Sequence, residues 1–162
     1  MSTTAPVANG LRTELGDFSS IVCFKAIVTG TEDALGEKAA AIALMAAGRS
    51  RGKQVAQQLG LTGKSITFEE MVPLLQSVLG KDGTRLCIVD KIAAIGDSIQ
   101  VHCRETICSS GEPQGSPRQL TFTLGVVQGV LEQVTGKRLR GKQTESVLRG
   151  SSHDVITFEV LQ

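Results

Sequence analysis

Apolar side chains recur every three or four positions between Thr31 and Gly60, as on one face of a helix. Thr31 or Asp33 can cap the start of such a helix, and Gly60 is suited to end it. The pattern therefore predicts one long helix or two helices that break near Gly48. Residues 11–30, ahead of this segment, hold apolar clusters that fit either a strand or a short packed helix.

Two further helices have clearer boundaries. Thr67 is followed three residues later by Glu70, which is the spacing of a capping box, and Gly80 ends the apolar pattern behind it. Residues 119–135 form another segment with apolar residues at helical spacing, and Gly136 follows as a stop.

Four segments have the alternation or the apolar character of strands. Residues 84–95 are apolar on both faces, which predicts a strand covered on both sides. Gly96-Asp97 then makes a turn, and residues 98–107 alternate between apolar and polar positions. Two more strands are expected near 139–148 and at 154–161.

The elements follow one another as helices, a hairpin, a helix and two strands. This order predicts an α/β fold of the α+β layered kind, with helices packed on a mainly antiparallel sheet of about four strands. The chain has 162 residues, a length typical of one domain. We expect a flexible N-terminus over residues 1–10 and a single domain over 11–162.

Composition excludes several classes of function. The net charge is +1 with no basic stripe, which argues against nucleic-acid binding. Tyr and Trp are absent, so a stacking platform for bases is not expected either. No apolar run is long enough to span a bilayer, and no signal peptide is apparent. Four cysteines without a CxxC motif fit reduced thiols in a cytoplasmic protein.

The residues with catalytic or metal-binding chemistry do not cluster in the sequence. His102 and His153 occupy polar positions that suit a solvated surface, and no spacing for a zinc site is present. Cys103 and Cys108 allow two interpretations: a regulatory disulfide, or burial of Cys103 with exposure of Cys108. The Gly63-Lys64-Ser65 triplet lacks the glycine spacing of a phosphate loop. We therefore predict no catalytic residue and no metal site.

Two pairs of glycines four residues apart are the most unusual feature of the helices. Gly48 and Gly52 form one pair, and Gly125 and Gly129 form the other. Each glycine inside a helix costs roughly 1 kcal/mol relative to alanine, so a compensating contact is expected. Either tight packing of one helix on another or a smooth wall for a bulky apolar ligand would compensate.

Three segments resemble a known family. They are Glu37–Leu59 with its alanine-rich AGR-x-x-G pattern, Thr121–Lys137 with G-x-x-x-G-x-L, and Thr144–Val160 with an acidic residue, a polar turn and a final strand. Together they resemble the 4-vinyl-reductase-like, or hydrocarbon-binding, domains.

The resemblance implies a fold akin to the vesicle-tethering TRAPP subunits, which are often dimeric and enclose a hydrophobic tunnel. Family members are linked to bacteriochlorophyll biosynthesis and to small apolar effectors. The family often carries cysteines at three C-terminal places, which hold Leu120, Leu148 and Ile156 here. These apolar replacements suit a dry core and make a metal or reactive-thiol role unexpected.

From the resemblance we expect non-catalytic binding of a small hydrophobic ligand, tetrapyrrole- or lipid-like, in an apolar pocket between helices and sheet of a homodimer. The alternatives are an assembly subunit, with a protein partner in a membrane-associated or photosynthetic complex, and a vinyl reductase, for which no nicotinamide or flavin fingerprint is present. The expected pocket walls are Leu44, Gly48, Ile88, Cys103, Phe122, Val126, Gly129 and Phe158.

Overall fold

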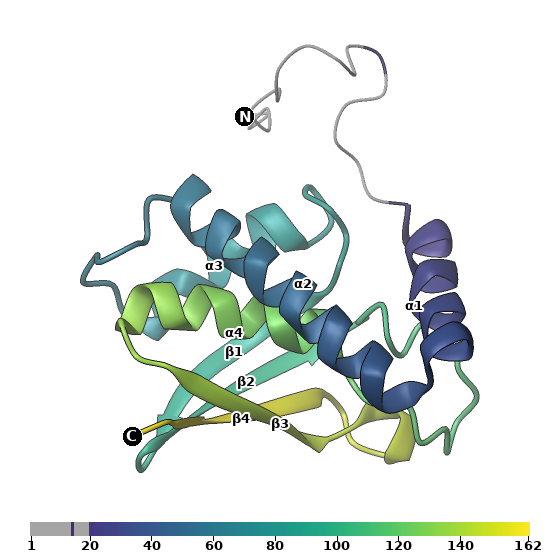
Figure 1. The fold of residues 1–162 in the computed structure, drawn as a ribbon. Coiled ribbons are helices and arrows are strands. Elements are labelled where there is room, and N and C mark those ends of the chain that lie inside the picture. The colour runs from purple at the N-terminus through teal and green to yellow at the C-terminus, as the bar shows by residue number, and fades with distance from the viewer. Residues whose placement is uncertain (1–13, 15–19) are drawn as a thin grey trace.

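Helices cover one face of a four-stranded antiparallel sheet in the computed structural model, which describes Glu14 and residues 20–162 (Figure 1). The predicted flexible segment, residues 1–10, lies outside the described residues, as do 11–13 and 15–19 of the predicted domain. The predicted fold class is confirmed. The elements are α1 (Ile21–Leu35), α2 (Glu37–Gln58), α3 (Phe68–Leu79), β1 (Ile88–Ile95), β2 (Ser98–Arg104), α4 (Phe122–Thr135), β3 (Leu139–Glu145), η1 (Val147–Arg149) and β4 (Asp154–Val160).

The sheet has the strand order β1-β2-β4-β3, and all three neighbouring pairs are antiparallel. Gly96 has a φ of 58° and makes the predicted turn between β1 and β2. A bulge between Val89 and Lys91 leaves Asp90 without a partner in the register of β1 with β2. Such a bulge re-aims a side chain, and here it brings Asp90 toward Arg104.

The first two helices correct the predicted boundaries. Residues 21–35 form α1, so Thr31 and Asp33 lie inside a helix and do not cap one. The break falls at Gly36 instead of near Gly48, because Gly36 has a φ of 80°, a conformation that side chains disfavour. Beyond it, α2 continues without interruption through Gly48 and Gly52.

The local signals at the other helix ends are confirmed. The Thr67 hydroxyl accepts a hydrogen bond from the Glu70 amide at 3.2 Å, and the Glu70 carboxylate accepts from the Thr67 amide at 2.9 Å. Gly80 is the C-cap of α3, and Gly136 ends α4 in a left-handed conformation. The strand predicted near 139–148 is shorter than expected, because η1 begins at Val147.

The two glycine pairs bring the backbones of α2 and α4 into direct contact. A Cβ added at Gly48 would lie 2.2 Å from the carbonyl oxygen of Phe122, and one at Gly52 would lie 2.0 Å from that of Val126. A Cβ at Gly129 would lie 2.2 Å from the carbonyl oxygen of Arg49. The glycines therefore serve tight helix packing, which is the first of the two interpretations expected from the sequence.

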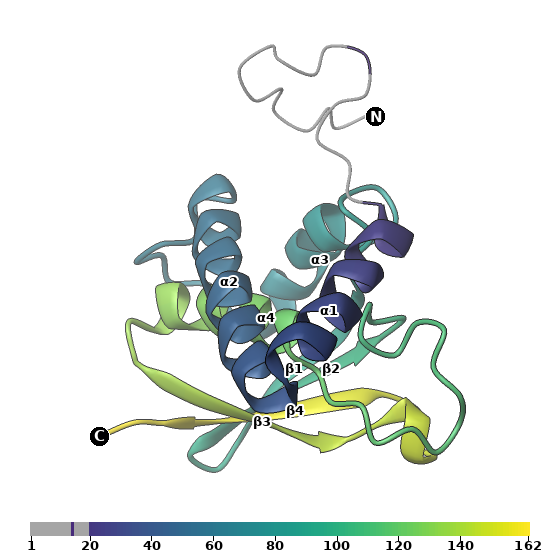
Figure 2. The same ribbon diagram turned by 45° about the vertical axis from the view of Figure 1, so that its right-hand side comes forward.

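Helix α4 lies between α2 and the sheet, and α1 stands at the edge of the helical layer (Figure 2). Phe158 of β4 is fully buried beneath α4, and its ring covers Gly141 on the neighbouring strand. Packed side chains from α4 and the sheet belong to one continuous apolar core. They occupy the layer interface where the sequence predicted a pocket, and the hollows described below lie elsewhere. None of the helices in the described residues is long and apolar enough to cross a membrane.

Candidate functional site

An apolar hollow of about 110 Å³ lies among side chains from all four helices and from the segment that links α3 to β1. Two phenylalanines form part of its wall, with ring centroids 4.7 Å apart and planes 68° apart. This edge-to-face arrangement is the preferred geometry of an aromatic pair. The apolar hollow is lined by Phe24, Arg51, Leu79, Thr84, Leu86 and Phe122.

The ends of several elements position this lining. Phe122 is the first residue of α4, and Leu79 is the last residue of α3. The Leu86 amide donates to the Leu79 carbonyl at 2.8 Å, which fixes the chain just beyond α3. The Thr84 hydroxyl donates to the carbonyl of Val78 at 3.3 Å, so its polar atom already has a partner. These hydrogen bonds hold the α3–β1 part of the wall in place.

Arg51 is the one charged residue of the lining. It extends from α2 and is half-buried. It makes no side-chain hydrogen bond or ion pair with any residue that the structure describes. The apolar hollow thus combines hydrocarbon walls with a single positive charge.

A second and larger hollow, the charged cleft, has a volume of about 400 Å³. It lies between the α1–α2 corner and the loop ahead of α4, and polar side chains dominate its wall. It is the more voluminous of the two, and four of its nine lining residues carry a charge. The charged cleft is lined by Glu32, Glu37, Lys38, Ala41, Ser116, Pro117, Arg118, Gln119 and Thr121.

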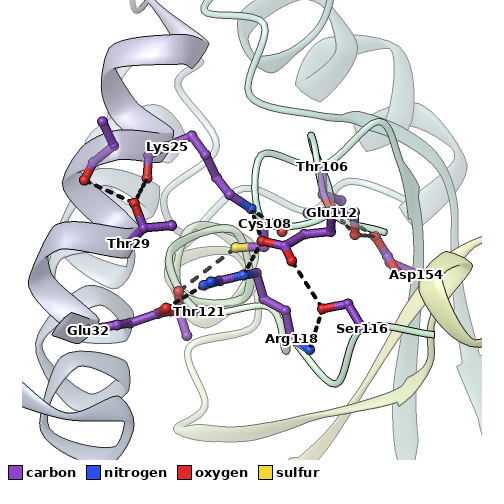
Figure 3. A network of polar contacts seen from close by, with 12 residues as sticks. Lys25, Thr29, Glu32, Thr106, Cys108, Glu112, Ser116, Arg118, Thr121 and Asp154 are labelled. Atoms are coloured by element: carbon purple, nitrogen blue, oxygen red, sulfur yellow. Dashed lines mark hydrogen bonds and ion pairs between the residues drawn. The ribbon is translucent and has the colours of Figure 1, made fainter. Parts of the chain in front are cut away.

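A network of ion pairs beside the charged cleft fastens this loop to α1 (Figure 3). Lys25 donates to the carbonyl of Cys108 at 2.7 Å and pairs with Glu112 at 2.8 Å. Arg118 binds both Glu32 and Glu112. The hydrogen bond from Lys25, aided by others and opposed by burial, lowers the pKa of Glu112. Because these charges satisfy one another, the network acts as a clamp on the loop.

Asp154 is a fully buried carboxylate that joins several loops. One oxygen accepts from the hydroxyls of Thr106 at 2.8 Å and Ser109 at 2.9 Å. The other accepts from the side-chain amide of Gln143 at 3.2 Å and the backbone amide of Val147 at 3.0 Å. Four donors thus satisfy this charge, and its role is to hold the loops together.

The two histidines are half-buried, and the structure corrects their predicted place on a solvated surface. His153 lies 3.0 Å from an oxygen of Asp90 through Nε2 and 2.9 Å from the Ser152 hydroxyl through Nδ1. Its ring is edge-on to His102, at 5.9 Å between centroids. Burial, with the charges of His153 and Lys91, lowers the pKa of His102. None of these residues lines either hollow.

The buried cysteines lie differently from both predicted arrangements. Cys103 is fully buried, and a hydrogen bond with the Cys87 thiol together with burial raises the pKa of Cys103. Cys108 was expected to be exposed near a loop, but it is buried and its sulfur lies 3.8 Å from the Thr121 hydroxyl. Ile107 and Cys108 anchor the loop in the core, and all four thiols are free.

One of the eight predicted wall residues, Phe122, lines the apolar hollow. The other seven lie elsewhere in the fold. Leu44 packs in a small cluster with Phe24, and Ile88 begins β1 opposite Arg104. Ligand contact at the eight positions stays a prediction. The residues placed in helix packing or in the core of the layers are Gly48, Cys103, Val126, Gly129 and Phe158.

Sequence reasoning did not identify the other five lining residues. Leu79, Thr84 and Leu86 come from a helix end and a connecting segment, where no periodic pattern marks them as a wall. One available signal was Arg51, which follows Gly48 by three positions and therefore lies near the tightly packed face of the same helix.

Comparison with solved structures shows the fold. The phenol-responsive sensory domain of the transcription activator PoxR, solved with phenol, has a TM-score of 0.67 and 16% identity, over 87% of this chain and 74% of that chain. Trafficking protein particle complex subunit 3 from Naegleria fowleri, covalently bound to palmitic acid, has a TM-score of 0.59 and 16% identity, over 88% and 93%.

A vinyl-4-reductase family protein from Methanocaldococcus jannaschii is also similar, with a TM-score of 0.49 and 14% identity, over 87% and 79%. No protein-family model and no curated protein matches the sequence. The likeness to the trafficking protein particle complex subunit confirms the expected relationship in fold to the TRAPP subunits. The chain therefore has the fold that the PoxR sensory domain and a TRAPP subunit share.

Proposed function

We propose that this domain binds a small apolar molecule, about the size of one aromatic ring, in the apolar hollow. The observation that carries the proposal is a hollow of about 110 Å³ with a preformed aromatic pair in its wall. For comparison, an engineered apolar cavity of about 150 Å³ binds benzene. Removing apolar surface from water supplies the affinity, at about 25 cal/mol per Å².

The size of the apolar hollow narrows the ligand class expected from the sequence. A tetrapyrrole has four five-membered rings and does not fit a space suited to a single ring. Two proteins of similar fold carry, respectively, phenol and a covalently bound palmitic acid. Phenol has the size that this hollow accepts. Of palmitic acid, only the end of the alkyl chain corresponds to a space of this size. Both support a small apolar ligand in place of a pigment.

The proposed role is binding without chemistry. Each thiol of the described core has a structural place, and the raised pKa of Cys103 keeps that group protonated and unreactive. Asp154 is engaged by four donors and lines neither hollow. We therefore propose that the domain binds its ligand in the hollow without converting it.

A titration with toluene, measured by isothermal calorimetry, tests this function. We expect saturable binding to the wild type and a loss of about tenfold or more in Leu86→Phe, equivalent to about 1.4 kcal/mol, because the larger ring fills the hollow. Thr84→Leu adds volume from a second position of the lining. Leu161→Phe, at an exposed site, serves as the matched control. Equal toluene affinity in folded Leu86→Phe and Thr84→Leu would contradict the proposal.

A second candidate is an assembly role, in which the domain forms a homodimer or binds a protein partner. It is favoured by large apolar side chains that α1 and α2 expose to solvent. Val22 is 81% exposed and Ile42 is 73% exposed, and Ile27 and Leu35 also face outward. Exposed apolar surface marks interaction sites in many proteins.

A further inference from the structure

We propose that the ligand of the apolar hollow carries a carboxylate, and that Arg51 binds it. The proposal rests on the proposed function and specifies the chemical class of the ligand as a small hydrophobic acid. An aromatic or branched body would lie against the phenylalanine pair, and the acid group would meet the guanidinium. The argument depends on the state of Arg51 compared with the other arginines.

Three arginines in the described part of the chain are half-buried: Arg49, Arg51 and Arg118. Arg49 pairs with Glu132 at 2.6 Å, and Arg118 binds one glutamate of α1 and one of the adjoining loop. Arg51 alone among them makes no hydrogen bond or ion pair with a described residue. Two of the three half-buried arginines are thus paired with carboxylates, and Arg51 has no such partner among the described residues.

The surroundings of Arg51 strengthen its attraction to an anionic partner. No acidic residue lines the apolar hollow, so nothing within it neutralises the positive charge. Partial removal of a cation from water is costly unless a counter-charge is supplied. Phe24, Leu79 and Phe122 reduce the water around the site and so strengthen any ion pair formed there.

The geometry of the guanidinium favours a carboxylate over other anions of this size. Its planar fork of N–H donors can bind both oxygens of a carboxylate at once. The apolar walls select the remainder of the ligand, because four of the six lining residues present only hydrocarbon. Together the two features recognise a compact molecule with one apolar end and one acidic end.

Benzoate and benzamide are a matched pair of probes, since they share ring and shape but differ in charge at pH 7. We expect calorimetry on the full chain to show that benzoate binds about tenfold or more tightly than benzamide. Arg51→Met keeps the length and the apolar stem of the side chain but removes the charge, so it should abolish this preference. Arg51→Lys should restore part of the preference.

Arg138→Met is the control, because Arg138 is exposed and lies outside the lining of the hollow. This variant should keep the full preference for benzoate. Equal binding of the two probes to the wild type would overturn the carboxylate assignment and leave the proposed function intact. A preference that survives in Arg51→Met would overturn the role of Arg51. Failure of both probes and of toluene to bind would overturn the proposed function and this inference with it.

Discussion

Glu132 shows how single residues hold the two layers together. It is a buried carboxylate on α4 that binds Arg49 of α2 at 2.6 Å and the backbone amide of Leu139 at 2.9 Å. Burial alone would raise the pKa of Glu132. The hydrogen bonds from Arg49, Leu139 and Gln128 outweigh that effect, and the pKa is lowered from its usual 4.5. One side chain thus links α2, α4 and the start of β3.

This lowered pKa predicts loss of stability in acid. Stabilisation by Glu132 is fully present above pH 4.5 and disappears as the pH falls through the lower pKa of the folded state. We expect Glu132→Gln to reduce the free energy of unfolding by about 1–3 kcal/mol at pH 7 and to flatten its decline toward pH 3. Urea unfolding at a series of pH values measures both effects.

The control for this experiment is Glu159→Gln, which removes an exposed partner of Arg140. Exposed ion pairs contribute little, so this variant should follow the wild type at every pH. If Glu132→Gln lost as much stability between pH 7 and pH 3 as the wild type, the buried pair with Arg49 would not have the assigned role.

At the same scale, the candidate site was only partly predictable. Phe122 was identified through the family resemblance, which implied a pocket between helices and sheet, although the hollow that it lines lies elsewhere. The pairing state of Arg51 could not be predicted, because it depends on which acidic side chains the fold places elsewhere. The role of Asp154 could not be predicted either, since its four donors come from two separate segments, 106–109 and 143–147.

Among the elements, the contact of α2 with α4 determines the character of the helical layer. The glycine pairs of the two helices allow each backbone to contact carbonyl groups of the other helix. Close approach of this kind supports weak Cα–H···O contacts and increases dispersion attraction. The compensation expected for helical glycines is therefore supplied by a neighbouring backbone.

Two glycine-to-alanine substitutions in helices should have opposite effects. In Gly52→Ala the new Cβ would lie 2.0 Å from a backbone oxygen, so the helices must separate, at a cost of about 3 kcal/mol or more. In Gly30→Ala the Cβ meets no atom within 4 Å, so the gain in helix propensity should stabilise the fold by roughly 0.5–1 kcal/mol. Thermal and urea unfolding compare them. Similar stability in both variants would contradict the packing described for α2 and α4.

Element boundaries were predicted well where a local signal sets them. The capping box at Thr67 and the stop at Gly136 depend only on neighbouring residues. The break between the first two helices was misplaced, because Gly36 and Gly48 look alike in sequence. They differ in what surrounds them: Gly36 turns the chain at a φ of 80°, and Gly48 lies against Phe122.

For the whole molecule, the apolar hollow depends on the meeting of four helices and a connecting segment. The layered fold was predictable from the order of elements, but the place of the hollow was not. It depends on how the ends of α1, α3 and α4 meet, and these contacts are distant in sequence. The exposure of apolar side chains on α1 is likewise visible only after the fold has assigned an inner face to that helix.

The proposed assembly role gives a prediction at this scale. If two copies associate through α1, Ile27→Asp should shift the protein from dimer to monomer in sedimentation velocity, because a charge would be buried in the contact. Ile95→Asp makes the same change at an exposed strand end outside α1, and should leave the dimer intact. A wild type that is monomeric at all concentrations would contradict self-association.

The most direct measurement of the central claim is the location of bound toluene by intermolecular NOEs in a carbon-13-labelled sample. The account predicts contacts from toluene to the methyl groups of Leu79 and Leu86 and to the rings of Phe24 and Phe122. Contacts confined to the interface of α4 with the sheet, at Ile156 or Phe158, or to the charged cleft, would contradict it.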